Sequence, residues 1–265
     1  MHTLVFCSFK GGTGKTTLSL NVGCNLAQFL NKKVLLIDLD PQSNLSSGLG
    51  GEFRSDQKGL HDIVHAPSDL KSIICKTKKN NVDIIPSSFL SEQFRETSIN
   101  NIPRNSLKLF LDEYCSPFYD FCIIDTPPSL GGLTKEAFIA GEKLIFCLTP
   151  EPFSILGLQK IREFLFSLGK PEDDHVLGIV LSFWDDRNST NQTYLDIIES
   201  IYKDKIFSTK IRRDISLSRS LLREDSVANV YPNSRASVDT LSLTHEIASL
   251  LQIKNKQKTL RGHCE

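Results

Sequence analysis

A glycine-rich turn follows directly after a short apolar run near the start of the chain. Thr3–Phe9 is mostly apolar, and Lys10–Thr17 reads Lys-Gly-Gly-Thr-Gly-Lys-Thr-Thr. A strand that leads into such a turn and then into a helix aims backbone N–H groups at phosphate oxygens. Glycine lets the backbone come close to those oxygens and adopt positive φ angles. The chain is therefore expected to bind a nucleotide phosphate at this turn.

Bulk properties limit the function classes. The chain has 265 residues, 40% of them hydrophobic, and a formal net charge of zero. Any affinity for nucleic acid must therefore come from a local patch. Seven cysteines without a Cys-x-x-Cys pair are typical of reduced thiols rather than of disulfides or a metal site. Because no signal peptide precedes the first strand and no apolar run reaches transmembrane length, we expect a soluble, cytoplasmic protein.

Apolar runs of strand length alternate with helix-like stretches along the chain. The predicted strands are Thr3–Ser8, Lys33–Asp38, Val82–Pro86, Phe121–Asp125, Leu144–Thr149, Val176–Phe183 and Ile206–Ile211. The predicted helices are Thr16–Leu30, Ser106–Cys115, Leu133–Ala140, Ser154–Leu168, Gln192–Tyr202 and Ser237–Leu251. This alternation predicts an α/β fold with a doubly wound, mostly parallel sheet flanked by helices.

The chain shows no linker that would divide it. We expect a single domain over residues 1–253, followed by a basic, disordered tail at 254–265. The polar stretch Ser43–Asp69 is expected to form loops and short helices at the carboxyl edge of the sheet.

Two further strands end in aspartate. Leu35–Gln42 reads Leu-Leu-Ile-Asp-Leu-Asp-Pro-Gln and carries Asp38 and Asp40, and Phe121–Pro128 carries Asp125. In an open α/β sheet both strands end at the carboxyl edge, beside the glycine-rich turn. An aspartate there can hold Mg²⁺ or orient a water molecule. Each aspartate alone is equally well explained as a turn or N-cap residue. The three elements in this order favour a nucleotide site.

These segments resemble a known family. Lys10–Thr17, Asp38–Gln42 and Ile123–Ser129 resemble the deviant Walker A, A′ and B motifs of the ParA/MinD ATPase superfamily. Within it, the chain is most similar to small ParA-type plasmid and chromosome partition ATPases, from Thr3 to about Leu251. The resemblance implies a P-loop NTPase fold of the deviant Walker A type, with ATP and Mg²⁺ as ligands.

The resemblance also implies roles for the residues of the turn. Lys15 would bind the β- and γ-phosphates, Thr16 the Mg²⁺ and Thr17 the α-phosphate. Lys10, the signature lysine, would cross a dimer interface to the partner's nucleotide and act in catalysis together with Lys15. The residues between the two lysines, Gly11, Gly12, Thr13 and Gly14, would line the phosphate site.

The carboxylates receive their roles in the same way. Asp40 would handle the attacking water, Asp38 would support the metal, and Asp125 would hold Mg²⁺ indirectly. ATP would then lie between two copies of the chain, so the nucleotide state would control formation of a homodimer.

The adenine base is expected over the ends of later strands. The candidate contacts are Phe183 and, in the turn Ile211–Asp214, Arg212 and Arg213. Relatives often have proline at the position of Arg212, so the chain departs from the family pattern there.

A basic segment suggests contact with DNA. Lys203–Arg223 contains seven lysines and arginines against two aspartates. Such clustering is typical of sequence-independent phosphate binding, and an ordinary solvated face is the alternative. By family resemblance Arg187 would hold DNA. The family has a second arginine at the position of Ser216, so this chain departs from the family there, and neighbours such as Arg213 or Arg219 would take over its role. The predicted DNA-binding residues are Arg187, Arg213, Arg219 and Arg223.

The resulting hypothesis is a partition ATPase. An ATP-bound dimer would bind double-stranded DNA non-specifically on the nucleoid, and a ParB-like centromere-binding protein would accelerate slow hydrolysis. The alternatives are a MinD-like membrane-associated ATPase and a metabolic P-loop enzyme. The tail from Lys254 lacks the bulky apolar face of a membrane helix. The absence of cysteine from Thr126–Ala140 disfavours a nitrogenase-type iron protein.

Overall fold

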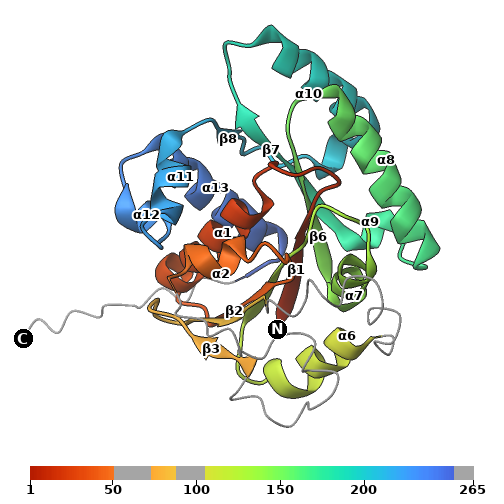
Figure 1. Cartoon of the computed structure of the whole chain (residues 1–265). Coiled ribbons are helices and arrows are strands. Elements are labelled where there is room, and N and C mark those ends of the chain that lie inside the picture. The colour runs from red at the N-terminus through yellow and green to blue at the C-terminus, as the bar shows by residue number, and fades with distance from the viewer. Residues whose placement is uncertain (51–72, 88–104, 254–265) are drawn as a thin grey trace, which may run out of the picture.

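A computed structural model describes residues 1–50, 73–87 and 105–253. Within these residues the strands form one sheet in the order β3-β4-β2-β5-β1-β6-β7-β8 (Figure 1). The strands are β1 (His2–Cys7), β2 (Val34–Asp38), β3 (Cys75–Lys76), β4 (Val82–Ile85), β5 (Phe121–Asp125), β6 (Lys143–Leu148), β7 (Val176–Trp184) and β8 (Ile211–Arg212). Only β3 pairs antiparallel with its neighbour; the other pairs are parallel. The predicted doubly wound, mostly parallel sheet is confirmed.

The helices are α1 (Lys15–Leu30), α2 (Asn44–Gly48), α6 (Ser106–Phe110), α7 (Gly132–Ala140), α8 (Pro152–Ser167), α9 (Glu172–His175), α10 (Ser189–Tyr202), α11 (Ile215–Leu221), α12 (Val227–Val230) and α13 (Arg235–Leu250). Most of them lie between the strands in sequence, and α11, α12 and α13 follow β8. A π-helical turn (Leu111–Cys115) and a 3₁₀ turn (Lys203–Lys205) complete the set in the described residues.

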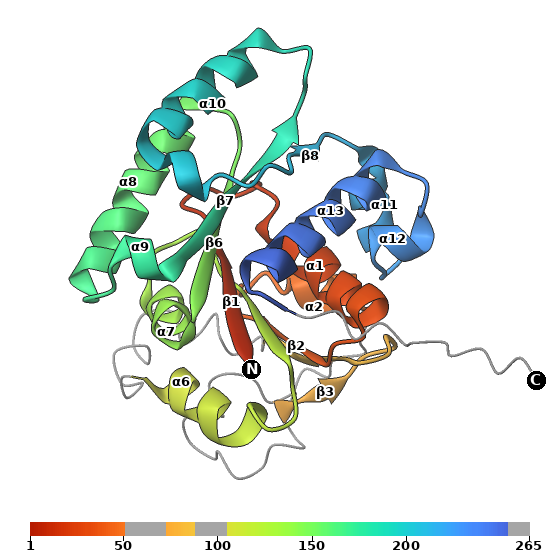
Figure 2. The same ribbon diagram turned by 180° about the vertical axis from the view of Figure 1, so that it is seen from behind.

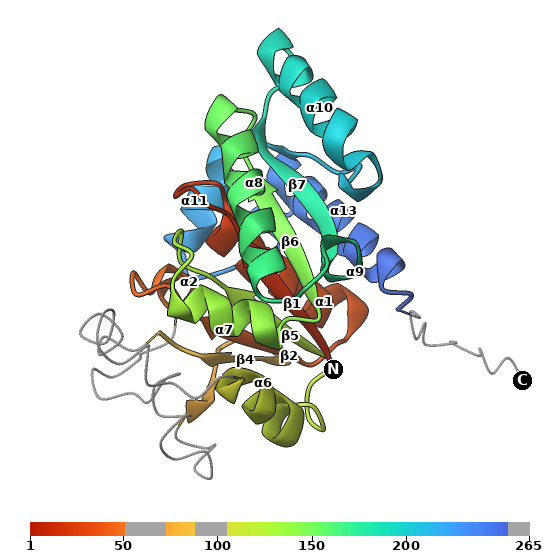
Figure 3. The same cartoon turned by 90° about the vertical axis from the view of Figure 1, so that its right-hand side faces the viewer.

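The two faces of the sheet pack against different helices. Along β1, Leu4 and Phe6 belong to a core cluster with residues of α1 and α13. Val5 and Cys7 point the other way, into a cluster with residues of α6, α7 and α8. This alternation follows from the two-residue period of a strand. Figure 3 shows the two helical layers from the side, and Figure 2 shows α1 beside α13.

Two predicted elements differ from the structure. Of the predicted strand Ile206–Ile211, only Ile211 lies in β8, and Ile206 makes an isolated bridge to Ile179. Between them, the N–H groups of Ser208 and Thr209 donate to the carboxylate of Glu246 on α13, at 2.6 and 3.0 Å. A side chain therefore replaces the neighbouring strand as their acceptor.

The second difference concerns the predicted helix Ser106–Cys115. It is α-helical only to Phe110 and continues as a π-helical turn, in which Ser116 N–H donates to the carbonyl of Leu111 at 2.9 Å. In the predicted loop region Ser43–Asp69, α2 is the described helix. Residues 51–69 and the predicted tail lie outside the described residues.

The topology brings the three sequence motifs to one edge. β1 lies between β5 and β6. After β1 the chain continues to β2, on the β5 side of β1, and after β5 it crosses to β6, on the opposite side. The strand register aligns Asp125 with Phe6 on one side and with Asp38 on the other. The carboxyl ends of β1, β2 and β5 are therefore adjacent, which is where open α/β sheets bind ligands.

Candidate functional site: a phosphate-binding turn and its carboxylates

The glycine-rich turn connects β1 to α1 with its backbone open. Gly12 and Gly14 have φ angles of 74° and 89°, a left-handed region in which a side chain is strained. Gly14 is the N-cap of α1 and makes no side-chain cap hydrogen bond. The first N–H groups of the helix are therefore available to an anion, and the helix dipole favours negative charge there.

Lys15 reaches back across the turn. Its side chain is buried, at 6% exposure, and its ammonium donates to Ser8 Oγ at 3.0 Å. Thr13 Oγ1 donates to the same oxygen at 2.8 Å, and Ser8 in turn donates to the carbonyl of Lys10 at 2.7 Å. An ammonium has three N–H donors, so Lys15 can still donate to phosphate oxygens while Ser8 holds it in place.

Asp125 lies directly beside the start of α1. Thr16 Oγ1 donates to Asp125 Oδ2 at 2.6 Å, and Ser19 Oγ donates to Oδ1 at 3.4 Å. Burial, together with the nearby carboxylate of Asp38, raises the pKa of Asp125 to about 8, although the hydrogen bond from Thr16 opposes the shift. A bound cation would remove this electrostatic cost.

Asp38 and Asp40 are fixed by their own loop. Asp38 accepts from Ser46 N–H at 2.9 Å, from Ser46 Oγ at 2.7 Å and from Asp40 N–H at 3.1 Å. Burial raises the pKa of Asp38 to about 6, although the hydrogen bonds from Ser46 oppose the shift. Asp40 is 8% exposed and accepts from Gln42 N–H at 3.0 Å. The carboxylates are therefore held in position before any ligand binds.

The donor set fits Mg²⁺. Thr16, Asp38 and Asp125 offer hydroxyl and carboxylate oxygens, the ligands that Mg²⁺ prefers. In the described residues, no group of three or more His, Cys, Asp or Glu side chains could hold a metal by itself. Mg²⁺ commonly uses one or two protein oxygens and completes its shell with phosphate and water. The residues present therefore match a metal that binds together with a nucleotide.

Lys10 has a different partner from Lys15. Its ammonium forms an ion pair with Glu151, the N-cap residue of α8 in the same chain. The side chains are 45% and 46% exposed, so both reach the molecular surface. The turn therefore presents one buried lysine to the phosphate site and one exposed lysine outward.

A small pocket adjoins the turn. Its volume is about 260 Å³, and the predicted base contacts Phe183, Arg212 and Arg213 all line it, together with Gly14 and Thr17. Phe183 has a φ of 57°, which is unusual for an aromatic residue, and its ring is 40% exposed. The guanidinium of Arg213 lies 5.6 Å from the ring centroid. Flat, cationic walls of this kind suit an adenine base.

Arg212 is held within the fold. Its guanidinium donates to both carboxylate oxygens of Asp239 on α13, with a shortest distance of 2.6 Å, and its backbone N–H also donates to Asp239 at 3.0 Å. Asp239 is buried, at 6% exposure. The Arg212 side chain thus joins β8 to α13, and Arg212 also lines the pocket.

Several of the positive groups in the basic segment Lys203–Arg223 make contacts within the fold. Lys205 donates to the carbonyl of Val176, and Lys210 lies 4.5 Å from the ring centroid of Trp184. The four predicted DNA-binding residues, Arg187, Arg213, Arg219 and Arg223, are all exposed. Arg187 forms an ion pair with Asp185 at 3.2 Å, and Arg223 lies over Tyr231.

Several residues of the site escaped the sequence prediction. Ser8, Ser46, Glu151 and Asp239 each bind a predicted residue through a hydrogen bond or ion pair. Ser8 and Ser46 lie in or next to the predicted motifs, which is the only signal that could have found them. Glu151 and Asp239 are distant in sequence, and only the fold brings them to their partners.

Known proteins resemble this chain throughout its length. Residues 1–176 match a family model described as an AAA domain. A virulence plasmid ParA family protein, pGP5-D of Chlamydia trachomatis, is 82% identical over 254 residues, with 96% of each chain covered.

Solved structures agree with this relationship. The septum site-determining protein MinD of Pyrococcus horikoshii, complexed with Mg-ADP, has a TM-score of 0.78 at 25% identity and covers 97% of this chain and 99% of its own. The McdA(D38A)–ATP complex from Cyanothece has a TM-score of 0.83 at 23% identity, over 96% and 97% of the chains, and it supports the fold alone. The chain belongs to the ParA family within the ParA/MinD superfamily of P-loop ATPases.

Proposed function

We propose that this protein is an ATPase that partitions plasmid or chromosomal DNA, through ATP-dependent dimerisation, non-specific DNA binding and partner-stimulated hydrolysis. The convergence of Lys15, Thr16 and Asp125 at the carboxyl edge of the sheet is the observation that carries the proposal. The similarity to a plasmid ParA family protein supports its cellular role. Residues 1–253 would form the single ATPase domain.

Each residue of the phosphate site would have its own role. The N–H groups from Gly11 to Gly14 and the ammonium of Lys15 would hold the triphosphate, and Thr17 would reach the α-phosphate. Thr16, Asp38 and Asp125 would hold Mg²⁺, which neutralises charge on the phosphates. Asp40 would orient and deprotonate the attacking water as a general base. Phe183 and Arg213 would hold the base.

Lys10 would complete the site of a second copy. Its ammonium is paired with Glu151 on the surface, whereas that of Lys15 is buried against Ser8. An exposed ion pair contributes at most about 1 kcal/mol, so a partner's phosphates can replace Glu151 at little cost. A cation supplied in trans stabilises charge that develops on the transferred phosphoryl group. ATP would thereby join two copies of the chain.

Non-specific DNA is the proposed binding partner. Arg187, Arg213, Arg219 and Arg223 would contact DNA phosphates without reading bases, and the protein would act in the cytoplasm on the nucleoid. A ParB-like centromere-binding protein would stimulate hydrolysis and so release the ATPase from DNA. Slow turnover without that partner would set how long a dimer stays bound.

The alternatives predict different ligands. A MinD-like protein would bind lipid, and a metabolic enzyme would bind neither lipid nor DNA. In the described part of the chain, no helix combines the length and apolar character needed to cross a bilayer. The similarity to a plasmid ParA protein over 96% of the chain favours partition over both.

The decisive experiment measures DNA binding against nucleotide state. Purified protein is titrated with random-sequence duplex DNA in the presence of ATP and Mg²⁺, of ADP and Mg²⁺, or of no nucleotide. We expect tight binding only with ATP and a steep fall in affinity with salt, since each phosphate contact contributes about 0.9 to the log–log slope. Binding to anionic vesicles but not to DNA would refute the partition function.

A further inference from the structure

The amino edge of the sheet, opposite the nucleotide site, is hollowed and rich in lysine. Three hollows of about 810, 510 and 520 Å³ meet there, and all three are lined by Asn81. Their lysines come from two segments that are distant in sequence: the turn after α1, and the end of β3 with the turn that follows it. We call the following residues the amino-edge surface: Lys32, Lys33, Lys76, Lys78 and Lys79.

Backbone pairing brings these two segments together. The segment after α1 leads into β2, and the turn between β3 and β4 leads into β4, which is the parallel neighbour of β2. Val34 N–H donates to the carbonyl of Asn81 at 2.9 Å, which joins the turns directly. The arrangement of the lysines is therefore fixed by the sheet rather than by flexible side chains.

Acidic residues neutralise only part of this charge. Lys76 pairs with Asp83 at 2.6 Å, and Lys79 pairs with Asp225 at 2.7 Å. Asp120, the third acid that lines the hollows, accepts from the backbone N–H of Lys33 at 2.8 Å. In the described part of the chain, Lys33 and Lys78 are exposed and no ion pair to either ammonium is present.

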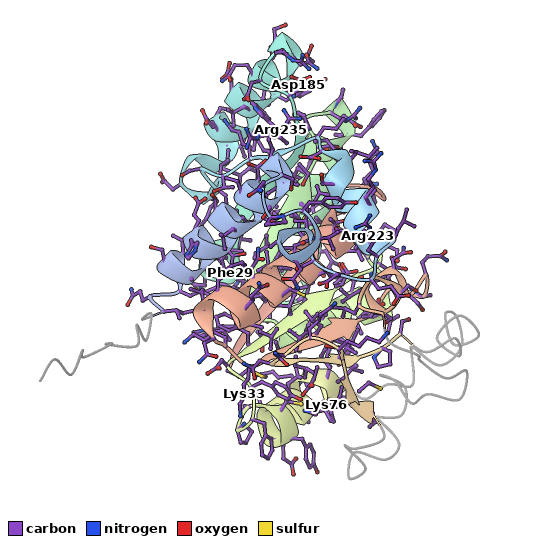
Figure 4. The ribbon with its side chains drawn as sticks, turned by 90° about the vertical axis from the view of Figure 1, so that its left-hand side faces the viewer. Phe29, Lys33, Lys76, Asp185, Arg223 and Arg235 are labelled. Atoms are coloured by element: carbon purple, nitrogen blue, oxygen red, sulfur yellow. The ribbon has the colours of Figure 1, made fainter. Side chains whose placement is uncertain are left out.

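The surface is continuous with the predicted DNA-binding arginines. Asp225, the partner of Lys79, follows Arg223 closely in sequence and lies between α11 and α12. Figure 4 shows Arg223, Lys33 and Lys76 on one face of the molecule. At its other end, the hollow beside Lys33 is lined by Gln252 and Ile253, where the described part of the chain ends. Basic residues thus extend from the region of α11 to the amino edge of the sheet.

We infer that the amino-edge surface is a second contact site for the phosphate backbone of duplex DNA, continuous with the arginines of α11 and separate from the ATP site. The inference rests on the proposed DNA binding and extends its footprint to Lys33 and Lys78. Lysine contacts to phosphates give sequence-independent affinity, in which each phosphate contact releases counterions.

The chemistry of the surface favours nucleic acid over lipid. Its lysines lie on turns and at the end of β3, and are accompanied by Asn31, Asn80 and Asn81, whose amide groups can donate to phosphate oxygens. A protein that lies on a membrane instead presents an apolar helix face flanked by cations. The concave form also suits a rod-shaped polyanion better than a flat bilayer.

The test compares two double variants of the full-length protein. Lys33→Gln/Lys78→Gln removes two charges from the amino-edge surface. Lys108→Gln/Lys135→Gln removes two charges from α6 and α7, in the helical layer on the other face of the sheet. Binding of random-sequence duplex DNA with ATP and Mg²⁺ is measured at several salt concentrations, with thermal unfolding and ATP affinity recorded for each variant.

The amino-edge variant should weaken DNA binding and make the log–log salt slope shallower by about two. Its ATP affinity and melting temperature should match those of the wild type, and the control should retain the wild-type slope. A wild-type slope in Lys33→Gln/Lys78→Gln, while the wild type binds DNA, would overturn this inference and leave the proposed function standing. No DNA binding by the wild type would overturn both.

Two further outcomes would also count against it. If the variant loses melting temperature but keeps its DNA affinity, the lysines only complement the negative C-terminal end of α1. If it loses affinity for anionic vesicles and not for DNA, the surface binds lipid headgroups.

Discussion

The two lysines of the glycine-rich turn differ in burial and therefore in what they can do. Lys15 is 6% exposed and is anchored by Ser8, so it can serve only its own phosphate site. Lys10 is 45% exposed and paired with Glu151 on the surface. A residue that must reach another molecule has to be accessible, and Lys10 meets that condition.

Replacement of Lys10 should separate ATP binding from formation of the dimer. Because we propose that Lys10 serves the partner's nucleotide, Lys10→Ala should change the ATP affinity of the monomer by less than about threefold. That change corresponds to less free energy than one hydrogen bond to a charged group contributes. It should abolish ATP-dependent dimerisation and stimulated hydrolysis. Titration with a fluorescent ATP analogue and light scattering measure these effects. A variant that loses monomer affinity as completely as Lys15→Ala would place Lys10 in its own site instead.

The buried carboxylate Asp125 makes stability depend on pH. Its folded-state pKa is raised to about 8, above the value of about 3.9 in an unfolded chain. The native state therefore retains a proton that the unfolded chain loses, so this contribution to stability is full below about pH 4 and is lost as the pH rises through 8.

Asp125→Asn tests this linkage without ligand. The amide cannot ionise, so the variant should melt higher than the wild type at pH 8.5 by a few degrees, at roughly 2–4 °C per kcal/mol. The difference should shrink at pH 5. Thermal unfolding without nucleotide or Mg²⁺ measures both. A difference that is the same at the two pH values would show that Asp125 does not titrate in this range.

At the scale of elements, β8 and α13 form a clamp beside the base pocket. β8 is short, and α13 supplies the acceptors that a longer strand would have found in the sheet: Asp239 for Arg212 and Glu246 for Ser208 and Thr209. The pocket wall that carries Arg213 is therefore positioned by helix carboxylates. A substitution of these carboxylates in α13 should therefore affect nucleotide binding.

Arg212→Gln tests the clamp. It leaves buried Asp239 without its ionic partner and should lower the free energy of unfolding by about 1–3 kcal/mol. Arg219→Gln, on the exposed face of α11, should cost less than about 0.5 kcal/mol. Denaturant unfolding of both variants gives the comparison. If Arg212→Gln weakened ATP binding while stability stayed unchanged, its guanidinium would act on the base rather than on the fold.

The sequence predicts the elements that carry strong local signals. β5 has the predicted bounds, and β1, β2 and α1 differ only at their ends, because buried parallel strands and the glycine-rich turn are visible in the residues themselves. The failures depend on distant contacts. The segment 206–211 has the composition of a strand, but the position of Glu246 on α13 turns the N–H groups of Ser208 and Thr209 away from the sheet.

The same distinction holds within the site. Motif residues and their order are readable from the chain, so the meeting of Lys15, Thr16 and Asp125 could be predicted. The ion pairs of Lys10 and Arg212 could not, because their partners are far away in sequence. The grouping of the amino-edge lysines could not be predicted either, because only the sheet places their two segments side by side.

At the scale of the whole molecule, a chain with zero net charge would separate its two proposed binding functions by position. The proposed phosphate-binding groups lie at the carboxyl edge of the sheet, and the lysine-rich surface lies at the amino edge. Binding of a polyanion at one edge need not compete with the triphosphate at the other. Nucleotide-dependent dimerisation would then double the number of phosphate contacts that one assembly makes, which couples ATP to DNA affinity.

The claim that ATP joins two copies can be tested by light scattering on Asp40→Ala, which should bind ATP and hydrolyse it poorly. The chain has a mass of 29.7 kDa. With ATP and Mg²⁺ the molar mass should rise to that of two chains, and with ADP it should remain at one. A molar mass that saturating ATP leaves unchanged would contradict the account, because the nucleotide would then not hold a dimer together.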